Sequence, residues 1–517
     1  MSSASSRESA GDVGLWPIAM LVMVVSVVTV VGIIATDGDP VVALAPVGAI
    51  LALCLLARMP LRYPALALLF FGMVLESPAE PLANGLFRSP IYVIGWLLLV
   101  HWNSVFPVKA LVFSGLDLSL IMFFTIASYR RATRSRVDGG GFVETPSPLR
   151  FFGWVTVFGA LFVEFWGAVR GNMDFGNSLW QIEHAAYLPL FFFAFHYAFR
   201  GPQDQAAVGK TIIAAATFRA GLAWCLRHFV TPNSIDLMPV ATTHSDSLLF
   251  AGAFGLCVAL LLEIPSAKNK LLCMVVLPIL ALGMVANNRR IVWVEIALGL
   301  AVLFFVMPMT PLKRKLIRWA LAAVPFIAIY LLVGWDHNGG FFGGAAVVRS
   351  IVDAKSDGSS EWRELENMDL IVSLQSSPFF GLGYGHHYIG PIVIQDVYAQ
   401  EHFLPHNSIL GVWAFGGIFG FTLNWMFLAV GAFVACRTYK FARRAIDRVA
   451  ALSLLQMLMI YMDQCFGDIG LGATTGVLLV SVGLAMVGKL ALTTGAWPAK
   501  VTTNAGTSAV VDRSVAS

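Results

Sequence analysis

Long apolar runs alternate with short polar segments along most of this chain. A helix needs about 20 residues to cross a hydrocarbon core of about 30 Å. Most of the runs approach or reach that length, and they lie at 15–36, 41–57, 62–76, 90–101, 108–128, 151–168, 184–199, 210–229, 247–264, 269–286, 291–308, 316–334, 405–435, 449–465 and 470–492. The pattern predicts an all-α, polytopic transmembrane helix bundle of about 12–14 spans, in which one short early run does not cross.

The composition agrees with this interpretation. Of 517 residues, 58% are apolar and only 12% are charged, whereas soluble domains carry about 25% charged residues. A soluble enzyme, a disordered chain and a disulfide scaffold are therefore excluded. The net charge of +4 gives no nucleic-acid signal, because the basic residues form short clusters between apolar runs. The six cysteines show no CxxC spacing and are interpreted as small apolar packing residues.

Basic clusters orient the predicted spans. Lys and Arg concentrate on the cytoplasmic side of membrane proteins. Four clusters, at 130–136, 268–270, 313–318 and 437–448, fall on one side when the spans after residue 129 are counted. We therefore expect this side, and the C-terminus, to be cytoplasmic.

The same count divides the chain into five predicted segments. They are a cytoplasmic tail (1–14), a transmembrane bundle (15–334), an external loop (335–404), C-terminal transmembrane helices (405–496) and a disordered tail (497–517). The loop up to residue 403 carries nine acidic and three basic side chains, a net charge of −6. Loops of this length are usually functional or serve as linkers.

Within the loop, an amphipathic helix is predicted from Ser360 to the Ser-Ser-Pro at 376–378. Ser360 can cap the helix, and its apolar residues recur at helical spacing: Trp362, Leu365, Met368 and Val372. A glycine-rich run, Gly381–Gly385, follows. It is either an ordinary loop or a place where the backbone approaches a phosphate or sugar.

Several arginines fall on the predicted outer side, against the positive-inside bias. Arg289 and Arg290 join two apolar runs, where they can hold a phosphate by bidentate hydrogen bonds or extend toward lipid headgroups. Arg170 lies at another outer turn. Arg363 lies in the external helix, where the alternative is a pair with Glu366 or Asn367.

A second candidate feature is Leu404-Pro405-His406-Asn407-Ser408. Pro405 suits the first turn of a helix, which places His406 and Asn407 near the N-terminus of a span. The positive end of the helix dipole favours a nearby anion and a neutral histidine, as a general base requires. On a continuous helix Gly417 and Gly420 share the His406 face, where they admit a lipid tail or a packed helix. The alternative is a capping histidine above a packing face.

Polar residues near these motifs suggest two further kinds of site. The histidines at 386, 387, 402 and 406 lie near Glu401, but no HExxH is present and Pro405 interrupts a helix through the last two, so no metal site is predicted. Asp463 and Asp468 lie before the last span, either as ordinary loop acids or as ligands for an acceptor sugar.

These motifs together resemble the bacterial O-antigen ligase and polymerase family. His406-Asn407, nine residues, then Gly417-x-x-Gly420 fits the family pattern. Three weaker similarities are Asn288-Arg289, Arg363 fifteen residues before the Pro-Phe-Phe-Gly-Leu-Gly at 378–383, and Val169-Arg170-Gly171. The similarity covers roughly 110–490. Asn288, Arg290 and Asn367 replace a Ser, a small residue and a Trp that are usual in the family.

The resemblance implies a multi-pass glycosyltransferase of the GT-C type in the bacterial inner membrane, without metal or cofactor. Its donor would be a glycan on undecaprenyl pyrophosphate. Its acceptor would be a hydroxyl of lipid A-core or of another lipid-linked repeat, at the periplasmic face, in lipopolysaccharide or exopolysaccharide synthesis. By this similarity His406 and Asn407 are catalytic.

The same resemblance assigns the binding residues. Arg289, Arg290, Arg363 and Arg170 hold the pyrophosphate, and the substrate groove contains Gly383, Tyr384, Gly417 and Gly420. Ligase and polymerase stay open alternatives. A transporter or glycan flippase is the other alternative, and Glu164 and Glu295 inside apolar runs are its best support.

Overall fold

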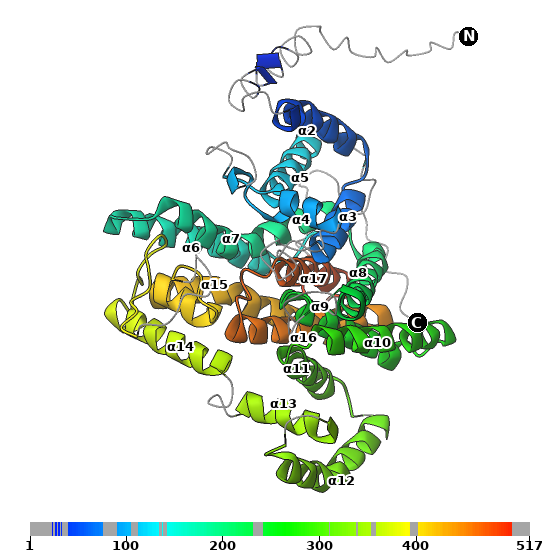
Figure 1. Ribbon diagram of the computed structural model, residues 1–517. Helices are drawn as coiled ribbons and strands as arrows, with labels where there is room; N and C mark the ends of the chain where they lie inside the picture. Colours follow the sequence, from blue (N-terminus) through cyan, green and yellow to red (C-terminus); the bar gives the residue numbers. More distant parts are fainter. Residues whose placement is uncertain are drawn as a thin grey trace, which may run out of the picture.

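A computed structural model describes residues 40–75, 90–104, 112–133, 142–230, 241–309, 311–337, 340–352, 358–392 and 402–498, with a few isolated positions before residue 40 and at 137. Within these ranges the chain is helical and contains no strand (Figure 1). The predicted all-α fold class is confirmed.

The helices coincide with the apolar runs. The first nine are α2 (Pro40–Arg58), α3 (Arg62–Val74), α4 (Pro90–Leu99), α5 (Gly115–Ala132), α6 (Ser147–Arg170), α7 (Phe175–Ala198), α8 (Gln205–Cys225), α9 (Ser245–Glu263) and α10 (Ala267–Asn287). The remainder are α11 (Ile291–Val306), α12 (Pro311–Gly334), α13 (Gly343–Val352), α14 (Gly358–Ser376), α15 (Ser408–Phe441), α16 (Ala445–Gly467) and α17 (Thr474–Thr493).

Eight of the described helices are long and apolar enough to cross a membrane, and two shorter helices, α3 and α11, are also apolar. Most of the first predicted span, 15–36, lies outside the described residues. The total number of spans and the five segments named above therefore stay predictions.

The core of the bundle surrounds α17, which is buried along nearly its whole length. It packs against α7, α9, α15 and α16. Because lipid tails are as apolar as these side chains, close packing rather than hydrophobic burial holds membrane helices together.

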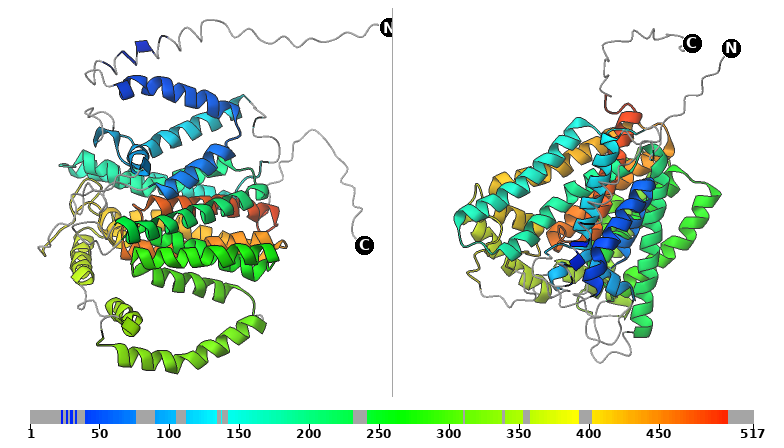
Figure 2. Two further views of the ribbon diagram at one scale, coloured as in Figure 1. Left: turned by 45° about the vertical axis from the view of Figure 1, so that its right-hand side comes forward. Right: turned by 90° about the horizontal axis from the view of Figure 1, so that it is seen from above.

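The bundle has two ends with different chemistry. At one, which we call the basic end, Arg448 Nε donates to Glu263 Oε2 at 2.6 Å and Gln205 Nε2 donates to Asp447 Oδ1 at 2.8 Å. At the other, which we call the site end, Leu471 N lies 3.4 Å from the Ser408 hydroxyl. In the left view of Figure 2 the bundle helices run roughly across the page and α14 lies across their left-hand ends.

This arrangement agrees with the parity of the predicted spans. The start of α16 and the end of α9 meet at the basic end. The basic clusters at 268–270 and 437–448 therefore lie at the same end of the bundle. The C-terminus of α10 and the N-terminus of α15 lie at the site end, opposite to them.

A break in α15 shapes the site end. Gly417 has φ 59° and ψ −168°, which is not helical, so two helical pieces meet there. The main chain of the glycine-rich segment fills the break: Leu382 N donates to Ala414 O at 2.9 Å and Gly383 N to Phe415 O at 2.8 Å. In return, Ile418 N donates to Pro378 O at 2.9 Å. The carbonyl and N–H groups released by the kink are thereby satisfied without water.

We call this contact between residues 377–383 and 414–419 the clamp. Its glycines are required by space, since a Cβ on Gly417 would lie 2.3 Å from the Phe379 carbonyl group. A Cβ on Gly381 would lie equally close to the Phe415 carbonyl group. The sequence predicts that Gly417 and Gly420 share a helix face with His406. This prediction requires a continuous helix, and the break at Gly417 removes that regular rotation.

Candidate functional site

Helix α14 packs against α15 at the site end. The predicted helix in the external loop is thus present, but its predicted apolar face is wrong. Met368 is 52% exposed and Val372 37% exposed, whereas four residues on the other face are wholly buried: Glu366, Asp369, Leu370 and Ser373. The polar face turns inward because it bonds backbone groups of the neighbouring loop: Ser373 Oγ accepts from Ile389 N at 2.7 Å.

His406 lies directly before α15 and against this buried face. Its backbone N–H donates to the Glu366 carboxylate at 3.1 Å, and its Nδ1 lies 3.5 Å from Glu366 Oε2. The Trp362 ring packs edge-on against the imidazole, with centroids 4.8 Å apart. The Glu366 carboxylate therefore faces the Nδ1 side of the imidazole and an aromatic ring packs against it, while 15% of the side chain stays exposed.

Asn407 is the N-cap of α15. Its Oδ1 accepts from Leu410 N at 3.1 Å, and its Nδ2 donates to Asn367 Oδ1 at 3.0 Å. The side chain is 2% exposed. Asn407 thus fastens the start of α15 to α14, next to the Glu366–His406 contact.

Replacing Asn407 separates these two contacts. We expect Asn407→Asp to keep the cap and lose the donor to Asn367, and Asn407→Ala to lose both. The alanine variant should lose about 1 kcal/mol more stability, the usual contribution of an N-cap. Thermal unfolding in detergent measures the difference, and equal melting temperatures for the two variants would contradict the capping role.

Arg289 belongs to a hydrogen-bonded chain at the same end of the bundle. One Nη donates to Nε2 of His244 and the other to Thr242 O at 3.3 Å. On its other side, His244 Nδ1 lies 2.8 Å from Asp468 Oδ2. The loops before α9, between α10 and α11, and after α16 are therefore joined by Arg289, His244 and Asp468.

The charge of Arg363 acts on this chain of hydrogen bonds. Burial and the positive charges of Arg289 and Arg363 lower the pKa of His244, with Asp468 opposing them, so the imidazole is neutral and accepts from Arg289. Burial alone would raise the pKa of the Asp468 carboxyl, but His244 and Arg363 outweigh it and hold that pKa below its usual range. Arg363 thus lies close enough to His244 and Asp468 for its charge to act on both.

One turn of α14 unites the two halves of this arrangement. Arg363 and Glu366 are three residues apart, and such side chains lie on the same side of a helix. The charge of Arg363 acts on His244 and Asp468, and the Glu366 carboxylate faces His406. Two of the four predicted phosphate-binding arginines and the predicted catalytic histidine therefore converge at the site end.

The other two arginines are placed differently. Arg170, at the end of α6, donates from Nη1 to Gly381 O at 3.1 Å, beside the clamp. Arg290 occupies the N-cap position of α11, next to Arg289, and is half-buried.

The predicted groove residues pack inside the protein. Gly383 and Gly417 belong to the clamp, and Gly420 packs against Val163. Tyr384 is 6% exposed and lies beside Phe415. The backbone approach anticipated at Gly381–Gly385 is made, but toward the protein's own main chain.

Two important residues escaped the sequence interpretation, and a third was undervalued. His244 stands alone before an apolar run, and only its place at the N-terminus of a predicted span marks it. The sequence predicts Glu366 as a partner for Arg363 on the surface, because the apolar spacing assigns the wrong buried side to α14. Asp468 is, from the sequence, either an ordinary loop acid or a ligand for an acceptor sugar, and neither alternative indicates its contact with His244. Its neighbour Asp463 has one buried carboxylate oxygen with no hydrogen-bond partner among the described residues.

Metal-binding capacity lies elsewhere among the described residues. His101, Asp117 and Glu183 place one possible ligand atom each within 4.8 Å of one another. His101 Nε2 lies 2.7 Å from Glu183 Oε2, and Tyr187 donates to Asp117 at 2.9 Å, so the protein itself supplies partners. In the 335–404 loop, His387 packs against His402 with ring centroids 5.4 Å apart. Glu401 lies outside the described residues.

The fold and this cluster define a polytopic helical membrane protein with cationic side chains and a carboxylate-held histidine at one end. Residues 274–424 match the family model described as O-antigen ligase. This region contains Arg289, Arg363 and His406, so the resemblance seen in the sequence is confirmed for this part of the chain. The match supports a general role as a membrane glycosyltransferase of the O-antigen ligase type. No curated protein matches the chain.

Proposed function

We propose that this protein transfers a glycan from undecaprenyl pyrophosphate to an acceptor hydroxyl at the periplasmic face of the inner membrane. The observation that carries the proposal is the Glu366–His406 contact on the turn of α14 that also bears Arg363, whose charge acts on His244, the partner of Arg289. Transfer of this kind needs a base beside the acceptor and cations beside the leaving pyrophosphate.

The proposed roles follow from the side chains. Arg289 and Arg363 bind the pyrophosphate and stabilise the negative charge that grows on it as the glycosidic bond breaks. His406 removes the proton of the acceptor hydroxyl, and Glu366 stabilises the imidazolium that results. Arg290 and Arg170 extend the cationic surface toward the remainder of the donor.

A lipid-facing groove beside the clamp suits the polyprenyl tail. It has a volume of about 650 Å³ and is lined by residues of 376–380 and by Ile418, Phe419, Thr422 and Leu423. Phe379 is 70% exposed there and Phe419 44% exposed. We propose that the tail of the donor lies in this groove, with Arg170 at its clamp side.

Gene deletion with complementation tests the proposed function. We expect the deletion strain to accumulate undecaprenyl-pyrophosphate-linked glycan and to lose surface polysaccharide, and the wild-type gene to reverse both. Arg289→Ala should lower transfer by about 10²–10³-fold, as loss of one preorganised charge-stabilising donor does. Arg443→Ala, an exposed arginine at the basic end, is the matched control.

Two outcomes would overturn the assignment. Full rescue by Arg289→Ala at equal protein level would remove Arg289 from the site. Normal surface glycan with changed solute uptake, or lipid-linked glycan held on the cytoplasmic side, would favour the transporter or flippase instead. The nature of the accumulated glycan separates the two acceptors, because a polymerase defect leaves single repeats and a ligase defect leaves polymer.

A further inference from the structure

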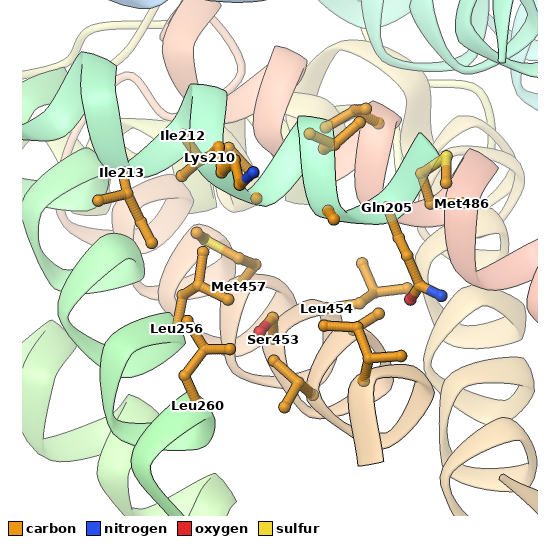
Figure 3. Close-up of a pocket in the computed structure, with 18 of the residues that line it drawn as sticks. Gln205, Lys210, Ile212, Ile213, Leu256, Leu260, Ser453, Leu454, Met457 and Met486 are labelled. Carbon is orange, nitrogen blue, oxygen red and sulfur yellow. The ribbon is translucent and has the colours of Figure 1, made fainter. Parts of the chain in front are cut away.

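An apolar cavity lies far from the candidate site, near the basic end of the bundle. Its volume is about 310 Å³, and α8 and α16 form its sides while α9 and α17 contribute its other walls (Figure 3). The lining comes from the first half of α8, the last turns of α9, the first half of α16 and the middle of α17. It therefore belongs to the half of the bundle opposite His406.

The walls of the cavity are those of a hydrocarbon site. Ile212, Leu256, Leu260, Leu454 and Met457 point into it (Figure 3). Leu272 of α10 also lines it and is 40% exposed, so the cavity opens toward the lipid-facing side of α10. Since a bilayer presents acyl chains at such an opening, an acyl chain is the apolar group expected to occupy the cavity.

The mouth of the cavity is cationic. Lys210 lines it and is exposed, and Lys268 and Lys270 flank the lining residue Asn269. Among the described residues these three lysines form no ion pair, whereas the nearby acids Asp447 and Glu263 are already paired with Arg444 and Arg448. The unpaired charge at the mouth is therefore positive, which complements a phosphate headgroup.

We propose that this cavity binds one acyl chain of an anionic phospholipid, with the headgroup phosphate at Lys210. Volume, wall chemistry and charge at the mouth agree on this occupant, because apolar ligand pockets begin at about 300 Å³ and basic pockets between membrane helices bind anionic headgroups. The site is separate from the proposed glycosyl transfer and does not depend on it.

Glycines of α8 offer a matched pair of variants. A Cβ on Gly209, which lines the cavity, meets nothing within 4 Å, and the same is true of Gly221, which does not line it. Gly209→Phe should fill the cavity, and Gly221→Phe places the same side chain on the same helix outside it. Ser453→Leu fills the cavity from α16 and removes a buried hydroxyl that has no hydrogen-bond partner among the described residues.

The measurement is lipid retention by native mass spectrometry after release from nanodiscs of phosphatidylglycerol and phosphatidylcholine in equal parts. We expect wild type and Gly221→Phe to keep one phosphatidylglycerol in preference to phosphatidylcholine, and Gly209→Phe and Ser453→Leu to lose it. Lys210→Gln should keep a lipid but lose the preference for phosphatidylglycerol. Size-exclusion profiles and melting temperatures establish that each variant is folded. If Gly209→Phe does not fold, Ser453→Leu serves as the variant with a filled cavity.

Three results would overturn the proposal. They are equal retention of phosphatidylglycerol by the filled and unfilled variants, equal retention of both lipids by wild type, and displacement of phosphatidylglycerol by polyprenyl phosphate added to the nanodiscs. The last result would assign the cavity to the polyprenyl chain. Transfer activity is not read in this experiment, so failure here leaves the proposed function unaffected, and the reverse also holds.

Discussion

His406→Ala is expected to lower glycan transfer by about 10²–10⁴-fold, the usual contribution of general acid–base catalysis, with little change in protein stability. The stability is preserved because His406 precedes α15, and its backbone N–H, which bonds Glu366, is kept in the variant. The measurement is single-turnover transfer from purified lipid-linked donor in detergent or nanodiscs, together with the melting temperature.

Two further variants show whether the histidine acts as a base. Glu366→Gln keeps an oxygen for the His406 N–H but removes the charge facing Nδ1, so we expect a smaller fall in transfer than His406→Ala causes. His402→Ala removes another histidine of the same loop and should leave transfer near the wild-type rate. If His402→Ala and His406→Ala reduce transfer equally, the base is not His406.

Gly417→Ala is expected to destabilise the protein by about 2–6 kcal/mol, combining backbone strain of about 1–3 kcal/mol with overpacking of about 1–3 kcal/mol. Its φ of 59° with ψ of −168° is available essentially to glycine alone. The added Cβ would also lie 2.3 Å from the Phe379 carbonyl group, which is main chain and cannot turn aside. Thermal unfolding in detergent and the yield of folded protein measure the effect.

Gly209→Ala and Gly221→Ala are the controls for this variant. Both positions are helical and open, so alanine there should be neutral or stabilising by about 0.5–1 kcal/mol. A Gly417→Ala protein with the wild-type melting temperature would show that the kink is not fixed by the clamp.

The fold was the part of this protein most accessible from sequence. Apolar runs of spanning length have one solution in lipid, a helix, because every backbone group must be satisfied within the segment. For this reason even the ends of α6, α10 and α17 fall within a few residues of the predicted runs. The break at Gly417 was not predicted, because a hydrophobic run does not reveal that a distant main chain takes over its hydrogen bonds.

The candidate site was predicted in its cations and its histidine but not in the groups that hold them. Arg289 and His406 stand out because charge is scarce and costly at the membrane. Glu366 was misread because apolar spacing along α14 was taken to mark its buried face, whereas that helix buries carboxylates that bond the backbone of residues 392 and 406. Spacing along a helix tells which residues share a face, and a short external helix can bury its polar face when loop N–H groups need acceptors.

The clamp also fixes the length of the segment that contains α14. The Asn367–Asn407 bond and the clamp fasten the same stretch at two points, so residues 368–377 have a fixed length and a fixed helical phase. One residue inserted there would turn Arg363 and Glu366 by about 100° relative to the clamp, away from Arg289 and His406. Residues inserted after Ile392, whose N–H still bonds Asp369 of α14, would only lengthen a connection between two fixed points. Variation in loop length, and any change of acceptor that comes with it, is therefore confined to one side of the clamp.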